Sequence, residues 1–552
     1  MKMQLIALKH SILLVCLQGG LCLCAQTVSV EKLPKAEVNF PFDAKPWVSW
    51  QWMQGTISKQ AITADLEAMQ KSGVSGAYIV PIKDTNSEIT VKIANGQAKS
   101  EWLAMINFAM QEAKRLNLQL AIHVSDGFAI TGNTLIKPEM SVQKLVWTKD
   151  FIKDGDTKEH KVEQPETVYG YYKDIAVYAY PANSRQAFSD IVQVPSVATS
   201  NGVRASFLCF TSDSKEIFKS DTTCWIQYKY SNLFTCRSVH IRAAGNNYSA
   251  QSICIQACND GMHFKTILKI VPSQTDQHNP GNDYNYSIPL TTARFFRFVY
   301  NKEDAAASAT NTDMPKWKPS LQLAGIYLSD EPVINEYEAK NGSACRELPV
   351  AKQQATDENA IPLKSIINLT DKMSSDGNLH WTAPAGNWVI IRIGHTSAGS
   401  TNVADAGKGL ECDRFDPAAV KTQFNDWFNR TFEKSDRKLV QQVLKIFYAD
   451  NPESINQNWS NVFATEFKKR RGYDLLPYLP AMTGVPVENN AASEKFLQDV
   501  RETIADLVND NFYATLKKLA HKKGFTFTAE PLPPAMPMDG TVHYTKRPIS
   551  SR

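Results

Sequence analysis

The stretch Trp47-Val48-Ser49-Trp50-Gln51-Trp52 begins a pattern in which short apolar strands alternate with amphipathic helices. Ser58 can cap a helix with apolar residues at helical spacing, and residues 77–81 follow it as a second strand. A second helix is predicted over residues 101–117 and a third strand over residues 118–124. Three strand–helix steps at this spacing predict a parallel sheet or barrel.

The pattern changes over residues 140–392, where β-branched and aromatic runs are separated by Gly, Asn, Asp and Pro. Such runs with hardly a helical period are typical of an all-β region. Within it, residues 236–242, 259–264 and 293–300 follow one another as strand, hairpin and strand, with Asp260-Gly261 as the tight turn. This order is similar to the discoidin-like jelly roll of many carbohydrate-binding modules.

The strand–helix pattern then returns. Strands are predicted over residues 388–393, 443–448 and 525–528, and helices over residues 416–434, 462–469 and 494–523. One α/β domain interrupted by a β domain is the most economical interpretation. The predicted divisions are a signal peptide at 1–25, a first α/β part at 26–139, the β insertion at 140–392 with a jelly-roll-like module at about 196–330, and a second α/β part at 393–552.

Composition and charge narrow the class of protein. The chain has 552 residues, of which 43% are hydrophobic and 21% charged, so a large core can be buried and disorder is excluded. The 60 Lys and Arg against 56 Asp and Glu give a net charge of +4. Because no basic block accompanies that charge, nucleic acid is not expected as a partner.

The N-terminus has the pattern of a secretory signal. Lys2 and Lys9 precede an apolar stretch that ends in small residues before Gln26, and this stretch is too short to span a membrane. We therefore expect export to the periplasm or the medium, with no transmembrane segment after cleavage. Leu21 and Leu23 disfavour lipid attachment at the neighbouring cysteines. Export permits disulfides among the five cysteines between residues 209 and 258, whereas their spacing is a weaker match to a metal site.

Candidate site residues follow the predicted strands, because reactive groups in such folds emerge at the carboxyl ends of parallel strands. Acids and aromatic side chains at these ends suit a sugar, since rings stack on apolar sugar faces and carboxylates bind hydroxyls and transfer protons. The candidates at strand ends are Trp50, Trp52, His123, Asp126, His395, Asp450, Glu453 and Glu530, and the acidic pair Glu411 and Asp413 gives two further candidates.

Several candidates have a structural alternative. Trp50 and Trp52 share one strand face and could be core residues, and Asp126 before a glycine could form a turn. His395 could be a hydrogen-bonded core histidine. Glu411 and Asp413 could be charges at a helix N-terminus, which the helix dipole favours. Glu453 and Glu530 are harder to explain structurally; Glu530 directly follows an apolar strand.

Several motifs resemble the catalytic domain of glycoside hydrolase family 106, typified by α-L-rhamnosidases. The resemblance begins at Pro46-Trp47 and covers the chain from there to its C-terminus. Its more specific stretches are Gly409 to Phe415, Asn458-Trp459 with Glu466 to Asp474, Pro477 to Pro480 with Thr483-Gly484, and Ala529-Glu530-Pro531.

The resemblance implies a (β/α)8-type barrel with inserted β domains that removes terminal α-L-rhamnose from plant or microbial polysaccharides by an inverting mechanism. Glu453 matches the family's general acid, although Asn451-Pro452 depart from the usual Asp-Ser-x-Glu motif. Glu530 matches the partner carboxylate, or else a sugar or metal ligand. The resemblance implies Ca²⁺ at the site and no organic cofactor; Asp126, Asp450 and the Glu411–Asp413 acids are substrate or ion candidates.

The C-terminal residues depart from the family. Asp539-Gly540 to His543-Tyr544 is similar to the approach to a further strand, but residues 546–552 do not match the acid-bearing segment that follows in the family. We therefore expect an incomplete barrel, with about six of its eight strands in a truncated domain. The alternative function is a non-catalytic carbohydrate-binding protein or an inactive fragment of such an enzyme.

Overall fold

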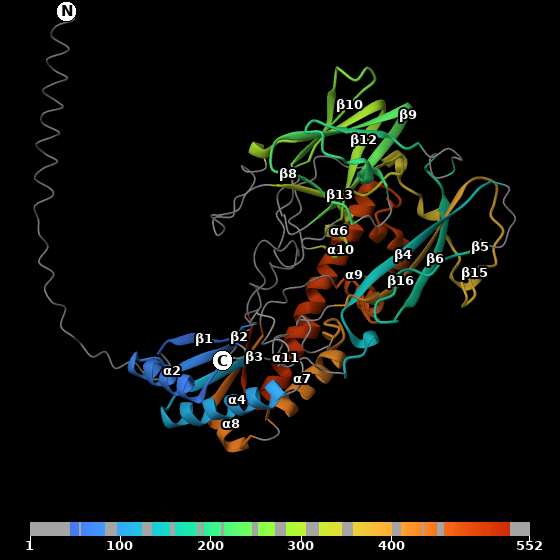
Figure 1. The fold of residues 1–552 in the computed structure, drawn as a ribbon. Helices are drawn as coiled ribbons and strands as arrows, with labels where there is room; N and C mark the ends of the chain where they lie inside the picture. The colour runs from blue at the N-terminus through green and yellow to red at the C-terminus, as the bar shows by residue number, and fades with distance from the viewer. Residues whose placement is uncertain are drawn as a thin grey trace, which may run out of the picture.

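The elements of the chain form three main sheets and a set of helices (Figure 1). In Figure 1 the seven-stranded sheet lies at one end of the molecule, the strands β1, β2 and β3 lie at the other, and the long helical segment of α10 and α11 runs between them. The expected signal peptide lies outside the described residues. The computed structural model describes residues 45–53, 57–82, 97–123, 135–154, 160–184, 188, 193–210, 215–244, 252–270, 283–304, 320–344, 357–399, 410–432, 435–449 and 457–529.

Five parallel strands form the first sheet, in the order β1-β2-β3-β17-β18. This confirms the parallel sheet predicted from the alternating pattern and its resumption after the insertion. Within the described residues the order is an open path, so they show an α/β sheet and not a closed barrel. The strands are β1 (Trp47–Met53), β2 (Gly76–Ile82), β3 (Gln119–His123), β17 (Leu444–Ala449) and β18 (Thr526–Ala529).

Helices cover one face of this sheet. As predicted, Ser58 caps α2 through a hydrogen bond from the Ala61 amide to its hydroxyl, 3.1 Å long. The helices bury their apolar sides against Phe447 and Phe527 of the sheet, and the Phe447 and Phe525 rings lie 4.5 Å apart. The covering helices are α2 (Lys59–Lys71), α4 (Gln97–Arg115), α7 (Pro417–Phe432), α8 (Arg437–Val443) and α11 (Ala514–Lys522).

The insertion begins with a four-stranded antiparallel sheet in the order β14-β6-β16-β4. Residues 388–393, predicted as a strand of the α/β part, belong to β16 in this sheet, so that prediction is wrong and the insertion extends to Ser397. Every residue of β16 is buried, and such a run lacks the alternation that separates an antiparallel strand from a buried parallel one. The strands are β4 (Gln143–Ile152), β6 (Lys173–Pro181), β14 (Ile367–Asn368) and β16 (Trp388–Ser397), with β5 (His160–Lys161) and β15 (Asn378–Leu379) as a separate pair.

The rest of the insertion contains a seven-stranded antiparallel sheet, and residues 236–242 and 293–300 lie in two of its strands. The Asp260 carboxylate accepts hydrogen bonds from the amides of Met262 and His263, and Gly261 has a φ of +79°, which forms the predicted tight turn. The strands are β7 (Ser196–Thr199), β8 (Phe218–Ser220), β9 (Cys224–Ala243), β10 (Ile253–Cys258), β11 (Lys265–Lys269), β12 (Asp283–Tyr300) and β13 (Leu321–Ser329).

The described cysteines do not form disulfides. Among them Cys209, Cys224, Cys236, Cys254, Cys258 and Cys412 are free thiols. The disulfides that export would permit are therefore not formed within this set. In the same part of the chain no helix has the length and apolarity needed to cross a membrane.

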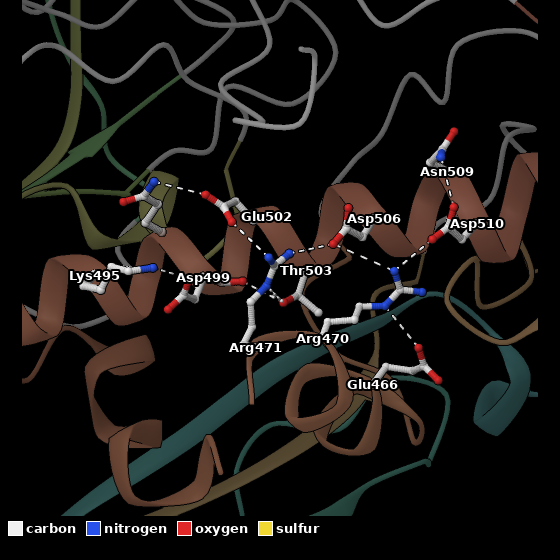
Figure 2. A network of polar contacts seen from close by, with 11 residues as sticks. Glu466, Arg470, Arg471, Lys495, Asp499, Glu502, Thr503, Asp506, Asn509 and Asp510 are labelled. Atoms are coloured by element: carbon white, nitrogen blue, oxygen red, sulfur yellow. Dashed lines mark hydrogen bonds and ion pairs between the residues drawn. The ribbon is translucent and has the colours of Figure 1, made fainter. Parts of the chain in front are cut away.

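A charged network joins α9 (Phe463–Arg471) to the long helical segment, in which the π-helix η9 (Val508–Tyr513) lies between α10 (Asn490–Leu507) and α11 (Figure 2). Arg471 binds Glu502 at 3.0 Å and Asp506 at 2.7 Å, and its Nε donates to the Thr503 hydroxyl at 3.0 Å.

The remaining described elements are short helices: η2 (Pro138–Met140), η4 (Ser206–Cys209), α6 (Tyr337–Lys340), η5 (Asp357–Asn359), η6 (Leu363–Ser365), η7 (Thr370–Lys372) and η8 (Leu476–Thr483).

Replacing Arg471 with Met tests this network, because Met keeps an apolar stem and removes the charged hydrogen bonds. The Arg471 side chain is only 16% exposed, so we expect the free energy of unfolding to fall by about 1–3 kcal/mol and the thermal midpoint by about 2–6 °C. The control is Lys468→Met on the exposed side of the same helix, which should change the midpoint little. Equal shifts in both variants would contradict a specific role for the network.

Candidate functional site

The five parallel strands bring their carboxyl ends to one edge of the sheet. In register, Met53 of β1 pairs with Ile82 of β2, and Ala449 of β17 pairs with Ala529 of β18. The strands that precede the two predicted catalytic glutamates are therefore neighbours that end level with each other. Four predicted site residues lie outside the described residues: Asp126, Asp450, Glu453 and Glu530.

The face of the sheet opposite the helices carries polar and aromatic side chains near this edge. The pairing registers place Tyr78, His123, Tyr448 and Thr528 on that face. The ring centroids of Tyr78 and Tyr448 lie 5.6 Å apart, and those of His123 and Tyr448 lie 4.6 Å apart. Tyr78 and Tyr448 are half-buried, His123 is 2% exposed, and Gln51 on the same face of β1 is exposed. We call these five residues the open-face set.

Burial sets the protonation of the tyrosine in the middle of this set. Desolvation raises the pKa of Tyr78, and the nearby Thr528 hydroxyl acts against that rise. Tyr78 is therefore protonated at neutral pH and can both donate and accept a hydrogen bond. Aromatic faces with hydroxyl groups of this kind can contact both the apolar and the polar side of a sugar ring.

Trp50 and Trp52 lie on the other face of β1, in the core under the helices. They are 5% and 2% exposed, and the Trp50 indole N–H donates to the Asp65 carboxylate of α2 at 2.9 Å. The Trp52 ring packs edge-on against Trp102 of α4, with centroids 5.2 Å apart. The structure thus assigns both residues to packing, which corrects their prediction as substrate-binding residues.

His395 lies in β16 of the inserted sheet and not at the end of a strand of the parallel sheet. It is 2% exposed, and its Nδ1 lies 3.0 Å from the Gln143 amide oxygen. Burial, with a smaller contribution from Lys173, lowers the pKa of His395 to about 4. The alternative of a hydrogen-bonded core histidine therefore describes this residue, and the substrate-binding prediction is corrected.

Asp413 is the centre of a buried polar network. One carboxylate oxygen accepts from the Phe415 amide at 2.9 Å and from the Gln457 amide group at 2.5 Å, and the other accepts from the Ser460 hydroxyl at 2.5 Å. Gln457 and Ser460 are each 1% exposed. Because both oxygens of Asp413 are engaged by the chain itself, the network assigns it a positioning role.

Glu411 and its neighbours also bind within the chain. The Glu411 carboxylate accepts from the Arg414 guanidinium at 2.7 Å, and both side chains are almost fully buried. The N-terminus of α7 is capped by Asp416, which accepts from the Ala418 amide at 2.8 Å. The helix-terminus alternative therefore does not describe Glu411 and Asp413, and their roles as substrate or ion ligands remain predictions.

The network connects three distant parts of the chain. Gln457 and Ser460 follow β17, Asp413 precedes α7, and the Asn458 side chain accepts from the Leu145 amide of β4 at 2.8 Å. Gln457, Ser460, Tyr78 and Tyr448 were not predicted as site residues. The signal for the tyrosines was available, because Ser49 and Gln51 alternate with Trp50 and Trp52 and mark the polar face of β1.

Comparisons with known proteins identify the family. The family model described as alpha-L-rhamnosidase, of glycoside hydrolase family 106, matches residues 38–542. The chain belongs to this family of glycoside hydrolases. It is 27% identical over 494 residues to a protein from Formosa agariphila named putative beta-glucuronidase, covering 89% of this chain and 30% of that protein.

The fold comparison agrees with the family. A solved rhamnosidase structure from Novosphingobium sp. PP1Y matches with a TM-score of 0.68 and 24% identity, covering 89% of this chain and 46% of that one. The chain thus spans less than half the length of either relative.

Ca²⁺, which the family resemblance implies, has no cluster of ligands among the described residues. They contain no group of three or more His, Cys, Asp or Glu side chains that could hold a metal ion. Ca²⁺ needs several oxygen ligands, and the oxygens of Asp413 already accept three hydrogen bonds from the chain. Asp126, Asp450 and Glu530, the other predicted ion candidates, lie outside the described residues, so calcium remains an expectation and no catalytic step is assigned to the ion.

The buried neutral His395 predicts a loss of stability in acid. Its folded pKa is lowered to about 4 from 6.5, so the unfolded chain binds more protons between these values. The contribution of neutral His395 to the free energy of unfolding is complete above about pH 6.5. It declines as the pH falls, by on the order of 2 kcal/mol at pH 5. Urea midpoints of the wild type should fall more steeply between pH 7 and 5 than those of His395→Gln. His521→Gln, at an exposed position of α11, should follow the wild type.

Asp413 predicts the opposite pH dependence. Burial raises its pKa to about 7 from 3.8, so the folded state binds more protons between these values and stability falls as the pH rises. Asp413→Asn mimics the protonated form, and the Ser460 hydroxyl can rotate to accept from the new amide. Between pH 4.5 and 7.5 the free energy of unfolding of the variant, measured by urea titration, should rise by on the order of 2–3 kcal/mol relative to that of the wild type. Asp371→Asn, at an exposed site, is the control. An equal gain in stability in this control would contradict the raised pKa of Asp413 as the cause.

Proposed function

We propose that this chain is the catalytic domain of an exported α-L-rhamnosidase that removes terminal α-L-rhamnose from plant or microbial polysaccharides. The observation that carries the proposal is the parallel pairing of β17 with β18, in register at Ala449 and Ala529. Glu453 and Glu530 follow these two strand ends in the sequence. Reactive groups of parallel α/β folds gather at this edge. The N-terminal signal pattern supports export.

The reaction needs two carboxyl groups in different protonation states. Glu453 acts as the general acid and protonates the leaving glycosidic oxygen, while Glu530 acts as the general base and removes a proton from water. That water attacks the anomeric carbon from the face opposite the leaving group, and the C–O bond to the aglycone breaks. Inverting enzymes hold the two carboxyl groups roughly 6.5–9.5 Å apart to admit the water. The product is then β-L-rhamnose.

The open-face set provides the binding surface beside these acids. The rings of Tyr78 and Tyr448 contact the apolar face of the sugar, and their hydroxyls, with those of Thr528 and the amide of Gln51, bind its polar groups. His123 packs against Tyr448 at 4.6 Å and fixes the orientation of that ring. Rhamnose suits this surface because its methyl group adds an apolar contact to a ring rich in hydroxyls.

The Asp413 network holds the chain that leads away from β17. Gln457 and Ser460 are the nearest described residues after Glu453 whose side chains bind this buried carboxylate. Catalytic groups must stay within a fraction of an ångström of their working geometry. We therefore assign the network the role of fixing one end of the segment that carries the acid.

Carboxylate replacement tests the catalytic roles. Glu453→Gln and Glu530→Gln should each reduce hydrolysis of an aryl α-L-rhamnoside by about a hundredfold or more, because an amide cannot transfer the proton. Proton NMR of the first product should show the β anomer before mutarotation. The matched control is Glu163→Gln, at an exposed position of the insertion, which should retain the wild-type rate.

Four outcomes would contradict the proposal. Unchanged turnover in Glu453→Gln would remove its role as acid, and initial release of the α anomer would exclude inversion. Faster hydrolysis of an aryl β-D-glucuronide than of the rhamnoside would assign the site to the substrate in the name of the Formosa agariphila relative. Binding of rhamnosyl glycans by the wild type without any release of sugar would favour the alternative of a non-catalytic binding protein.

A further inference from the structure

One row of polar side chains crosses the outer face of the seven-stranded sheet. The pairing registers align Gln227 of β9, Arg297 of β12, Gln256 of β10 and Thr266 of β11 across four neighbouring strands. The residues on both sides of each row member in β9 and β12 are buried, so the row itself faces outward. An outward row of a guanidinium, two amides and a hydroxyl is a set of hydrogen-bonding groups and is not needed by the core.

Arg297 is held rigidly in this row. Its guanidinium carbon lies 4.7 Å from the centre of the Trp225 ring and 3.7 Å from that of the Phe264 ring. Its Nε and Nη2 donate to the Gln227 side-chain oxygen at 3.1 and 2.7 Å. The arginine is therefore oriented before any ligand arrives, and binding costs less conformational entropy.

Among the described residues, no carboxylate forms an ion pair with the Arg297 guanidinium. Arg297 takes part in none of the ion pairs between described residues, and burial lowers its pKa, which reflects the cost of desolvating the charge. Lys229, two residues from Gln227 on the same face, lies over the Phe295 ring at 5.8 Å and is likewise outside those pairs. No Asp or Glu occupies the outward positions 225, 227, 229, 254, 256, 295, 297 and 299.

We infer that this outer face, centred on Arg297, is a binding site for acidic oligosaccharides. The partner chemistry is a carboxylate or sulfate group on a sugar chain, bound by the free N–H groups of the guanidinium fork. Gln256 and Thr266 bind neighbouring hydroxyls, Lys229 supplies a second positive charge along β9, and Phe264 and Trp225 border the site with apolar surface. The inference does not depend on the catalytic proposal, since the row belongs to a different sheet from the candidate active site.

Calorimetry with the whole chain tests the site. The probe is a short oligogalacturonate, and its methyl ester is the matched probe that keeps the sugar and removes the charge. A second pair, sulfated dextran and dextran, distinguishes a sulfate site from a carboxylate site. We expect at least one acidic probe to bind about tenfold or more tightly than its uncharged partner, with affinity that falls as salt is added.

Variants locate the binding. Arg297→Gln should weaken binding of the acidic probe by about tenfold or more, and Arg297→Lys should weaken it less, because it keeps the charge but loses the fork. Arg294→Gln, an exposed arginine of the same strand outside the row, should bind as the wild type does. Gln256→Leu and Thr266→Val change the surface without touching the Arg297 stack and should each weaken binding. Circular dichroism and thermal midpoints check that the variants fold.

The inference is rejected if the wild type binds neither acidic probe better than its uncharged partner. It is also rejected if Arg294→Gln weakens binding as much as Arg297→Gln, because the effect would then be net charge alone. Should Arg297→Gln fail to fold, unchanged binding in both Gln256→Leu and Thr266→Val would reject it. Glu453→Gln should keep the binding, so failure of the catalytic proposal and failure of this site are distinguishable.

Discussion

The parallel pairing of β3 with β17 is the constraint on which the rest of the structure depends. It aligns Ile122 with Phe447 and His123 with Tyr448, and so joins strands that residues 124–443 separate in the chain. Closing so long a loop costs entropy, which the burial of Phe447 among aromatic residues of the helices helps to offset. Once the two strands are parallel and in register, β18 beside β17 must end at the same edge as β1, β2 and β3. The site follows from this geometry.

The aromatic residues on one face of the parallel sheet pack in the core, and those on the other face are proposed to bind the sugar. Trp50 and Trp52 fill the space under α2 and α4, whereas Tyr78 and Tyr448 occupy the face that none of the described helices covers. The periodicity of strand and helix was enough to predict the sheet and four of its five covering helices, whereas α8 was not predicted. It did not decide which face of β1 was buried, because large aromatic side chains suit both a core and a sugar. The polar alternation of Ser49 and Gln51 carried that information.

The remaining errors have a common physical cause. β16 was grouped with the parallel strands because it is buried throughout, and local sequence does not distinguish a central antiparallel strand from a parallel one. His395 was predicted as a ligand of substrate because polar residues near apolar strands are typical of sites. Its partner Gln143, like the partners Gln457 and Ser460 of Asp413, is distant in sequence, so only the fold reveals these contacts.

A crystal structure of this chain with a non-hydrolysable aryl 1-thio-α-L-rhamnoside would show directly whether the sugar binds at the carboxyl edge of the parallel sheet, on the face that carries Tyr78 and Tyr448. We expect the rhamnose ring to lie against these two tyrosines, with its anomeric sulfur near the residues that follow β17 and β18. A ligand bound among the helices on the Trp50 face, or on the inserted sheets with the parallel sheet empty, would contradict this expectation.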